Sequence, residues 1–192
     1  MTGDTSKTVG PLPDTATASP RVPAVLTWLV WLLWAGSLGV LVAYLRAGGS
    51  WELAGIVAVD GLTVLLWVVV TFFSGIVHSY SRRYMAGSKG IERFFTRVFG
   101  FTLVVMVLVA AAHLALFVLA WLAMGLVMAD LIGYARDWPQ AQAASRVARR
   151  YFLASSLLLA VGVGRLWLAT DATTVTGVAT AAGEFSWTVW LP

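Results

Sequence analysis

The sequence contains no cysteine, which excludes thiol catalysis, disulfide bonds and metal sites built from thiolates. Only two histidines, His78 and His113, occur among 192 residues, so a metal site made of histidines alone is not expected. Charge is also scarce, because 11% of the residues are charged, against about 25% in a typical soluble domain. A water-facing surface is therefore difficult to build from this chain, and we expect no metal and no cofactor.

Apolar residues dominate instead. The chain is 59% hydrophobic, with a mean hydropathy of +0.83. Several runs exceed the roughly 18 apolar residues that mark a bilayer-spanning helix. The sequence therefore predicts an all-α fold, a polytopic membrane helix bundle with about five transmembrane helices. The expected spans are residues 24–45, 55–79, 95–109, 114–133 and 151–169.

One apolar stretch is too long for a single span. Residues 95–134 are apolar for roughly twice the thickness of a membrane, so this stretch must fold back on itself. We expect the break near residues 110–114, where His113 is the only polar side chain. The span before the break is short, and we expect it to begin one turn earlier than Phe95.

Polar segments flank the apolar region. Residues 1–23, rich in Thr, Pro, Ala and Gly, predict a disordered N-terminal tail. This tail is too long and polar for the short basic start of a cleaved signal peptide. Residues 24–169 form the predicted transmembrane domain, and residues 170–192 a C-terminal tail that ends in an aromatic cluster.

Loop charges predict the orientation. The two loops that follow the second and fourth spans are strongly basic, whereas the remaining loops are nearly neutral. A five-span arrangement places both basic loops on the same side, which the positive-inside rule identifies as the cytoplasm. We therefore expect a multi-pass protein of the cell membrane with a cytoplasmic N-terminus, in contact with anionic lipid and not with nucleic acid. The basic loop residues are Arg82, Arg83, Lys89, Arg93, Arg149 and Arg150.

Three ionisable residues in or near the spans are candidates for proton relay or for structural polar roles: Asp60, His78 and Asp130. Asp60 stands in the first turns of the second span, where a carboxylate caps a helix. His78 lies at the other end of that span, either as a proton relay or as an interfacial histidine beside Tyr80 and Tyr84.

Asp130 lies near the cytoplasmic end of the fourth span, where Arg136, or Arg149 and Arg150 across the loop, can neutralise it. The spacing of the polar residues matches no catalytic triad, zinc motif or phosphate-binding glycine loop, so we assign no catalytic residue. The glycines at 162 and 164 predict a helix-packing feature.

Four segments occur in an order typical of a known family: VDGLT at Val59–Thr63, HSYSRRYM at His78–Met85, RFF at Arg93–Phe95 and AWLAMG at Ala120–Gly125. Together they resemble the N-terminal part of the antiporter-like membrane subunits of respiratory complex I, specifically NADH-quinone oxidoreductase subunit L (chain 5). The resemblance extends over residues 55–167. It implies a subunit of a proton- or cation-coupled complex, and an NADH dehydrogenase label would be inherited from the family.

Departures from the family pattern point to a branch. In the family a glutamate used in proton translocation follows the tryptophan, whereas here Leu122 follows Trp121. The segments around residues 78–85 and 149–153 are more similar to the inorganic-carbon transporter subunit DabB, which pairs with the zinc-containing, carbonic-anhydrase-like DabA. That similarity implies uptake of CO2 or bicarbonate driven by a cation gradient.

Family subunits are several hundred residues longer than this chain, which predicts an N-terminal module, a split subunit or a truncated product. The expected partners are membrane subunits that carry the missing helices, a DabA-like zinc protein and the lipid bilayer. The alternative is a small structural or assembly membrane protein without transport activity. The transported ion and the helix packing stay open at this point.

Overall fold

The computed structural model describes residues 21–87 and 90–184. Its elements, in chain order, are α1 (Arg21–Ala47), β1 (Trp51–Leu53), β2 (Val57–Val59), α2 (Gly61–Tyr84), α3 (Ile91–Ala110), α4 (Leu114–Ile132), α5 (Pro139–Thr170) and α6 (Val175–Glu184). The helices α1 to α5 are each long and apolar enough to cross a membrane. The predicted all-α bundle with about five spans is therefore confirmed.

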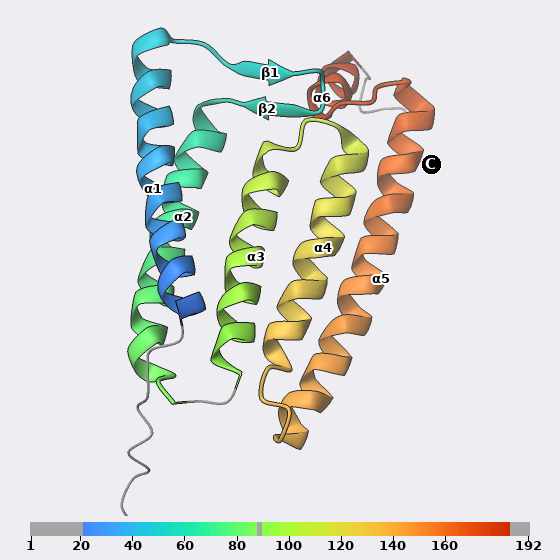
Figure 1. Ribbon diagram of the computed structural model, residues 1–192. Coiled ribbons are helices and arrows are strands. Elements are labelled where there is room, and N and C mark those ends of the chain that lie inside the picture. Colours follow the sequence, from blue (N-terminus) through green and yellow to red (C-terminus); the bar gives the residue numbers. More distant parts are fainter. Residues whose placement is uncertain (1–20, 88–89, 185–192) are drawn as a thin grey trace, which may run out of the picture.

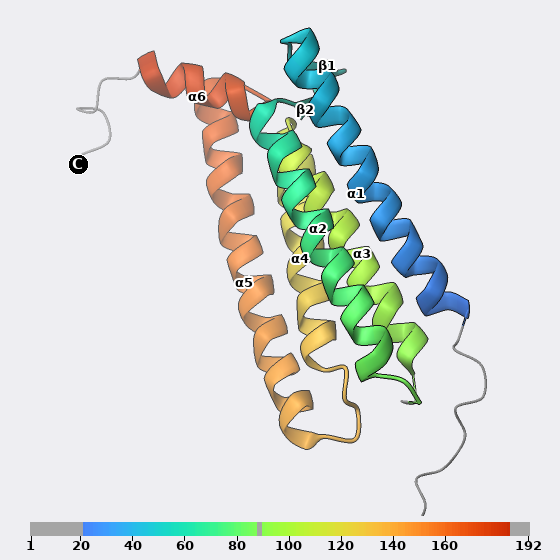
Figure 2. The same ribbon diagram turned by 90° about the vertical axis from the view of Figure 1, so that its left-hand side faces the viewer.

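The five long helices run side by side and alternate in direction (Figure 1). Helix α1 packs on α2 and α3, α3 packs on α4, and α4 packs on α5, so neighbours in sequence are mostly neighbours in space. Helices α2 and α4 finish at the same end of the bundle, and we call this end the arginine end. The opposite end is called the plate end. At the plate end α6 turns crosswise to the long helices and extends outward past α5 (Figure 2).

The predicted break in the long apolar stretch is confirmed. Helix α3 ends at Ala110 and α4 begins at Leu114, and α3 starts at Ile91, one turn before Phe95. His113 accepts a hydrogen bond at Nδ1 from the backbone N–H of Ala115, at 3.2 Å. A polar side chain at this break therefore satisfies one of the unpaired amides at the start of α4.

Two other boundaries differ from the prediction. Helix α2 begins at Gly61 rather than at residue 55, because residues 57–59 pair with 51–53 as an antiparallel hairpin. Helix α5 begins at Pro139, well before residue 151, with its proline in the first turn, where a missing N–H costs nothing. The hydropathy argument missed these early turns because they are polar and carry Arg146, Arg149 and Arg150.

Three segments form a backbone plate at one end of the bundle: residues 51–59, 111–114 and 172–175. The carbonyl oxygen of Ile56 accepts hydrogen bonds from the amides of Ala112 and His113, at 3.0 and 3.1 Å. The amide of Leu114 donates to Thr173, and the amide of Val175 donates to Ala112, both at 2.9 Å. Non-helical backbone close to lipid needs such internal partners.

The predicted spans leave residues 46–54 between them as a connection, and the hairpin of residues 51–59 was not predicted. Helix α6 forms inside the region predicted as the C-terminal tail. The terminal aromatic cluster and residues 1–20 of the predicted N-terminal tail lie outside the described residues.

Small residues bring α4 and α5 into close contact. Gly125, Ala129 and Gly133 follow each other at intervals of four and so share a face of α4. A Cβ atom added to Gly125 would lie 2.9 Å from Cβ of Phe152, and one added to Gly133 would lie 2.7 Å from Oγ of Ser145. Ser145 Oγ donates to the carbonyl oxygen of Ala129 at 2.6 Å, which adds a polar link to this contact.

The glycines at 162 and 164 make no helix contact within the described residues, so the packing predicted for them stays a prediction. A Cβ atom added at either position would meet no described atom within 4 Å. The close approach of backbones is instead made on α4, where the spacing of small residues is four rather than two.

Candidate functional site

A row of polar side chains lies buried on one face of α2. Thr71, Ser74, His78 and Ser81 are separated by three or four residues, so they share a helix face, and each is at most 8% exposed. In a membrane protein, buried polar groups on a span belong to the bundle interior and mark candidate functional positions.

The row makes its main cross-helix contact with α3. The hydroxyl groups of Ser74 and Thr102 lie 2.6 Å apart. The His78 ring is 1% exposed and packs edge-on against Phe95, with ring centroids 5.3 Å apart. We call Ser74, His78 and Thr102 the histidine cluster.

Hydrogen bonding fixes the tautomer of His78. Its Nδ1 lies 2.8 Å from the carbonyl oxygen of Ser74, and a carbonyl can only accept, so Nδ1 carries the hydrogen. Nε2 is then the acceptor of the neutral ring; within the described residues it is buried and makes no hydrogen bond of good geometry, although the backbone of Phe95 lies close to the ring. An acceptor in a low-dielectric interior can take a hydrogen bond or a proton, which is the chemistry a relay requires.

His78 does not share a surface with Tyr80 and Tyr84, as the interfacial interpretation expected. Tyr80 and Tyr84 are 66% and 76% exposed and stack on each other with ring centroids 5.7 Å apart, away from the buried histidine. The partners Ser74 and Thr102 were not singled out from the sequence. The helical spacing of the polar residues on α2 was the signal that could have found Ser74.

Asp60 is the N-cap of α2. Its carboxylate accepts a hydrogen bond from the backbone N–H of Thr63 at 2.8 Å. This hydrogen bond is the largest cause that holds the pKa of Asp60 below its ordinary value, since it stabilises the charged form. The side chain is exposed, so the geometry describes a helix cap at the plate end.

Asp130 pairs with a residue that the sequence did not suggest. Its Oδ2 lies 2.5 Å from Nε of Arg97, which reaches across from α3 to α4. No ion pair joins Asp130 to Arg136, Arg149 or Arg150 among the described residues, so those expected partners are wrong.

The three candidate residues do not form one row. Asp60 and His78 lie at opposite ends of α2, about 27 Å apart along a helix that rises 1.5 Å per residue. Asp130 is at the same end of the bundle as His78 but on α4, where it is engaged with Arg97. The histidine cluster is thus the interior polar site, and the two aspartates mark the bundle ends.

Charge is divided between the two ends. The described acids at the arginine end are Glu92, Asp130 and Asp137. The plate end has four described acids, Glu52, Asp60, Asp171 and Glu184, and two described arginines, Arg46 and Arg165. The described arginines at the arginine end are Arg21, Arg82, Arg83, Arg93, Arg97, Arg136, Arg146, Arg149 and Arg150. Lys89 lies outside the described residues.

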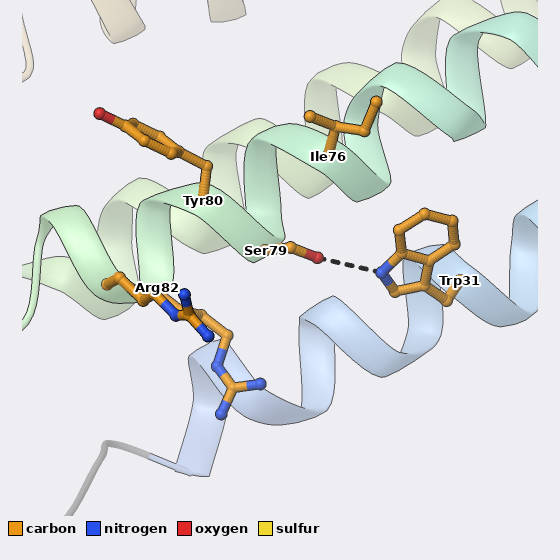
Figure 3. Close-up of a pocket in the computed structure, with 6 residues that line it drawn as sticks. Trp31, Ile76, Ser79, Tyr80 and Arg82 are labelled. Atoms are coloured by element: carbon orange, nitrogen blue, oxygen red, sulfur yellow. Dashed lines mark hydrogen bonds between the residues drawn. The ribbon is translucent and has the colours of Figure 1, made fainter.

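A cavity of about 680 Å³ opens between α1 and α2 at the arginine end. Figure 3 shows Nε1 of Trp31 donating to Oγ of Ser79, at 3.1 Å, with Arg82 beyond. The indole lies directly over Gly75, where an added Cβ would be 3.0 Å from the ring. This glycine therefore lets the two helices approach.

Comparisons with known proteins match most of the described bundle. Residues 49–95 match the model for the NADH-ubiquinone oxidoreductase (complex I) chain 5 N-terminus. Residues 111–191 match the model for the transmembrane region of the NADH:quinone oxidoreductase/Mrp antiporter family. The two matches fall on consecutive segments in the order in which the four sequence motifs occur.

Named relatives agree with these models. NADH-quinone oxidoreductase subunit L of Rickettsia typhi is 36% identical over 95 residues, which is 50% of this chain and 14% of the relative. The probable inorganic carbon transporter subunit DabB1 of Halothiobacillus neapolitanus is 36% identical over 106 residues, 52% of this chain and 19% of the relative. NADH-ubiquinone oxidoreductase chain 5 of Chondrus crispus is 34% identical over 94 residues, 49% of this chain and 14% of the relative.

The chain thus spans less than a fifth of the length of each of these three relatives. One family model is for a transmembrane region, and five described helices are long and apolar enough to cross a membrane. The chain belongs to the family of antiporter-like membrane subunits represented by complex I chain 5 and the Mrp antiporters.

Proposed function

We propose that this chain is a membrane subunit or N-terminal module of a proton- or cation-coupled complex. The observation that carries the proposal is the histidine cluster, a hydrogen-bonded polar site inside the span of a chain of the antiporter-like family. Polar side chains are costly inside a bilayer, so they are kept where they serve a pathway or a contact. His78, with its buried ring and its Nε2 not engaged by another side chain among the described residues, is the candidate relay residue.

Inorganic-carbon uptake is the finer form of this proposal. It is supported by the DabB1 relative and by the leucine that follows Trp121, where the family resemblance implies a glutamate. A chain without that glutamate suits a role in which another subunit handles the carbon substrate. A DabA-like zinc protein is then the expected soluble partner.

Other membrane subunits are expected beside this one. Helix α5 carries a series of exposed apolar side chains, among them Leu157, Leu158 and Leu168, each at least 66% exposed. Lipid covers such a surface as readily as protein does, so the support for protein partners comes from the much greater length of the relatives. Those partners would supply ion-carrying helices in addition to the five described here.

The proposed location is the cell membrane, with the N-terminus in the cytoplasm. The support is the concentration of arginines at the end where α1 begins, because basic residues concentrate on the cytoplasmic side of membrane proteins. Fusing a reporter that is active only in the cytoplasm to either terminus tests this orientation. Activity from a C-terminal fusion and none from an N-terminal one would reverse it.

A second candidate is a structural or assembly membrane protein without transport. One observation favours it: His78 is the only ionisable side chain that is buried in the described spans. A proton pathway across about 30 Å of hydrocarbon needs a longer series of such groups. We therefore predict that the chain alone conducts no protons when reconstituted in vesicles.

The deciding experiment is purification of the tagged chain from its native membrane in mild detergent, followed by mass spectrometry of the associated proteins. Recovery of a DabA-like protein, or of a membrane subunit with the missing helices, supports the transport role. The same pull-down with His78→Phe tests whether the complex still assembles. Cation-coupled flux is then measured in vesicles that contain the variant complex, and it is expected to fall. Recovery of the chain alone as a dispersed monomer would remove the transport proposal in favour of the structural one.

A further inference from the structure

A second cavity, of about 520 Å³, lies at the arginine end where α3, α4 and α5 meet. Five arginines and one acid line it: Arg97, Arg136, Arg146, Arg149, Arg150 and Asp130. They come from three elements and from the loop between α4 and α5, so the site exists only in the folded bundle. We call it the arginine pocket.

The pocket carries a large excess of positive charge. Asp130 engages Arg97, and no other acid lies within ion-pair distance of the five arginines among the described residues. Arginine keeps its charge at neutral pH, so the group cannot relieve its mutual repulsion by losing protons. An anion with several acceptor oxygens would satisfy both the charge and the unused guanidinium donors.

Hydrogen bonds hold the walls in place. Gln142 Nε2 donates to the carbonyl oxygens of Gly133 and Ala135, at 2.8 and 3.2 Å, and ties the loop to the first turns of α5. The bond from Ser145 to Ala129 fixes α5 against α4 directly beside the pocket. The arginine side chains therefore extend from a backbone frame that does not have to form on binding.

The position of the pocket indicates where its anion comes from. Leu153 forms part of its lining and is 46% exposed, and Leu157, one turn further along α5, is 66% exposed. An anionic headgroup in the pocket can thus continue into acyl chains along an apolar surface. Basic pockets between transmembrane helices at the cytoplasmic side bind the headgroups of acidic lipids in this way.

We propose that the arginine pocket binds the phosphate of an anionic membrane lipid. The expected contacts are two-point hydrogen bonds from guanidinium groups to phosphate oxygens, with Arg146 and Arg149 as the central pair on α5. Asp130 opposes the bound charge and limits the affinity. The proposal does not depend on transport, since a structural subunit would bind the same lipid.

The test measures binding of phosphatidylglycerol to the purified full chain in detergent, by native mass spectrometry with phosphatidylcholine as the neutral comparison. Arg146→Gln with Arg149→Gln is expected to weaken binding about tenfold or more, because two charged donors are lost. Arg82→Gln with Arg83→Gln is the matched control, since it removes two arginines at the same end but outside the pocket. Equal losses in both double variants would overturn the proposal.

Asp130→Asn gives a test with the opposite sign. It removes the negative charge of the pocket and frees Arg97, so phosphatidylglycerol is expected to bind more tightly than to the natural chain. Weaker binding in this variant would contradict the charge argument even if the arginine variants failed to fold. The last measurement uses inorganic phosphate as a competitor of the lipid. Competition by inorganic phosphate at concentrations equal to the lipid would assign the pocket to the free ion and overturn the lipid assignment.

Discussion

The hydroxyl groups of Ser74 and Thr102 lie 2.6 Å apart and join α2 to α3 in the interior of the bundle. Thr102 also donates to the carbonyl oxygen of Val98 in its own helix, at 3.0 Å. Ser74 in turn supplies the carbonyl oxygen that orients His78. One serine thus connects the cross-helix contact to the candidate relay residue.

We expect Ser74→Ala and Thr102→Val to be coupled in their effects on stability. A double-mutant cycle, measured by unfolding in mixed detergent micelles, should give a coupling energy of about 0.6 kcal/mol and at most about 1.7 kcal/mol, the range for hydrogen bonds between membrane helices. Thr96→Val is the control on α3, because Thr96 bonds only to Glu92 of its own helix in the described contacts. Coupling between Ser74 and Thr96 as large as that between Ser74 and Thr102 would contradict this account.

Replacing His78 by alanine should destabilise the bundle. The change removes a fully buried ring from its contact with Phe95 and leaves a cavity, for which about 2–5 kcal/mol is typical in large-to-small core substitutions. Tyr84→Ala, six residues further along α2 on the exposed surface, should cost less than about 0.5 kcal/mol. Both are measured by thermal unfolding of the purified chain, and similar shifts for the two would show that His78 is not part of the core.

A pair of glycine substitutions separates close packing from helix propensity. Gly125→Ala places a methyl group against Phe152 and should cost about 1–3 kcal/mol through overpacking. Gly162→Ala meets no described atom and should stabilise the chain by roughly 0.5–1 kcal/mol, because alanine favours the helix. The free energy of unfolding checks both signs, and a stabilised Gly125→Ala variant would mean that α4 and α5 are further apart than described.

Asp60 predicts a pH-dependent contribution to stability. Asp60→Ala should cost about 0.5–2 kcal/mol through loss of the cap, whereas Asp60→Asn should cost little because asparagine caps as well. The pKa of Asp60 is lower in the folded chain, so its contribution is complete above the unfolded value near 3.9 and is lost as the pH falls through the folded value.

The gap in melting temperature between the natural chain and Asp60→Ala is therefore expected to narrow in acid, while Asp60→Asn, which keeps an uncharged cap, serves as the control. The measurement is a series of thermal melts at pH 7 and at several values below 4. A difference that does not change with pH would remove the charged cap from the explanation.

The sequence predicted what depends on local hydropathy and chain length. The five spans, the break before Leu114 and the early start of α3 follow from the number of apolar residues that a bilayer accommodates. The histidine cluster was only half visible, because the spacing on α2 marks a polar face but nothing local identifies Thr102 as its partner. Arg97 was missed as the partner of Asp130 for the same reason, since the two residues belong to different helices.

Backbone pairing at the plate end was beyond a hydropathy argument. Residues 51–59 are too short a run to distinguish a hairpin from a loop, and their hydrogen bonds to residues 112 and 113 are set by the fold. The early turns of α5 were hidden by their polarity, although Pro139 marks the helix start. The arginine pocket likewise exists only because α3, α4 and α5 meet at the arginine end.

The plate also has a consequence for biosynthesis. Helices α3 and α4 can enter the membrane as a hairpin, yet the amide of Leu114 finds its partner only in Thr173, which follows α5 in the chain. The turn between α3 and α4 is therefore completed after α5 has crossed and carried Thr173 to the same face. Until then the amide of Leu114 lacks this partner, whereas the amides of Ala112 and His113 can already pair with Ile56, so the turn is completed in two stages.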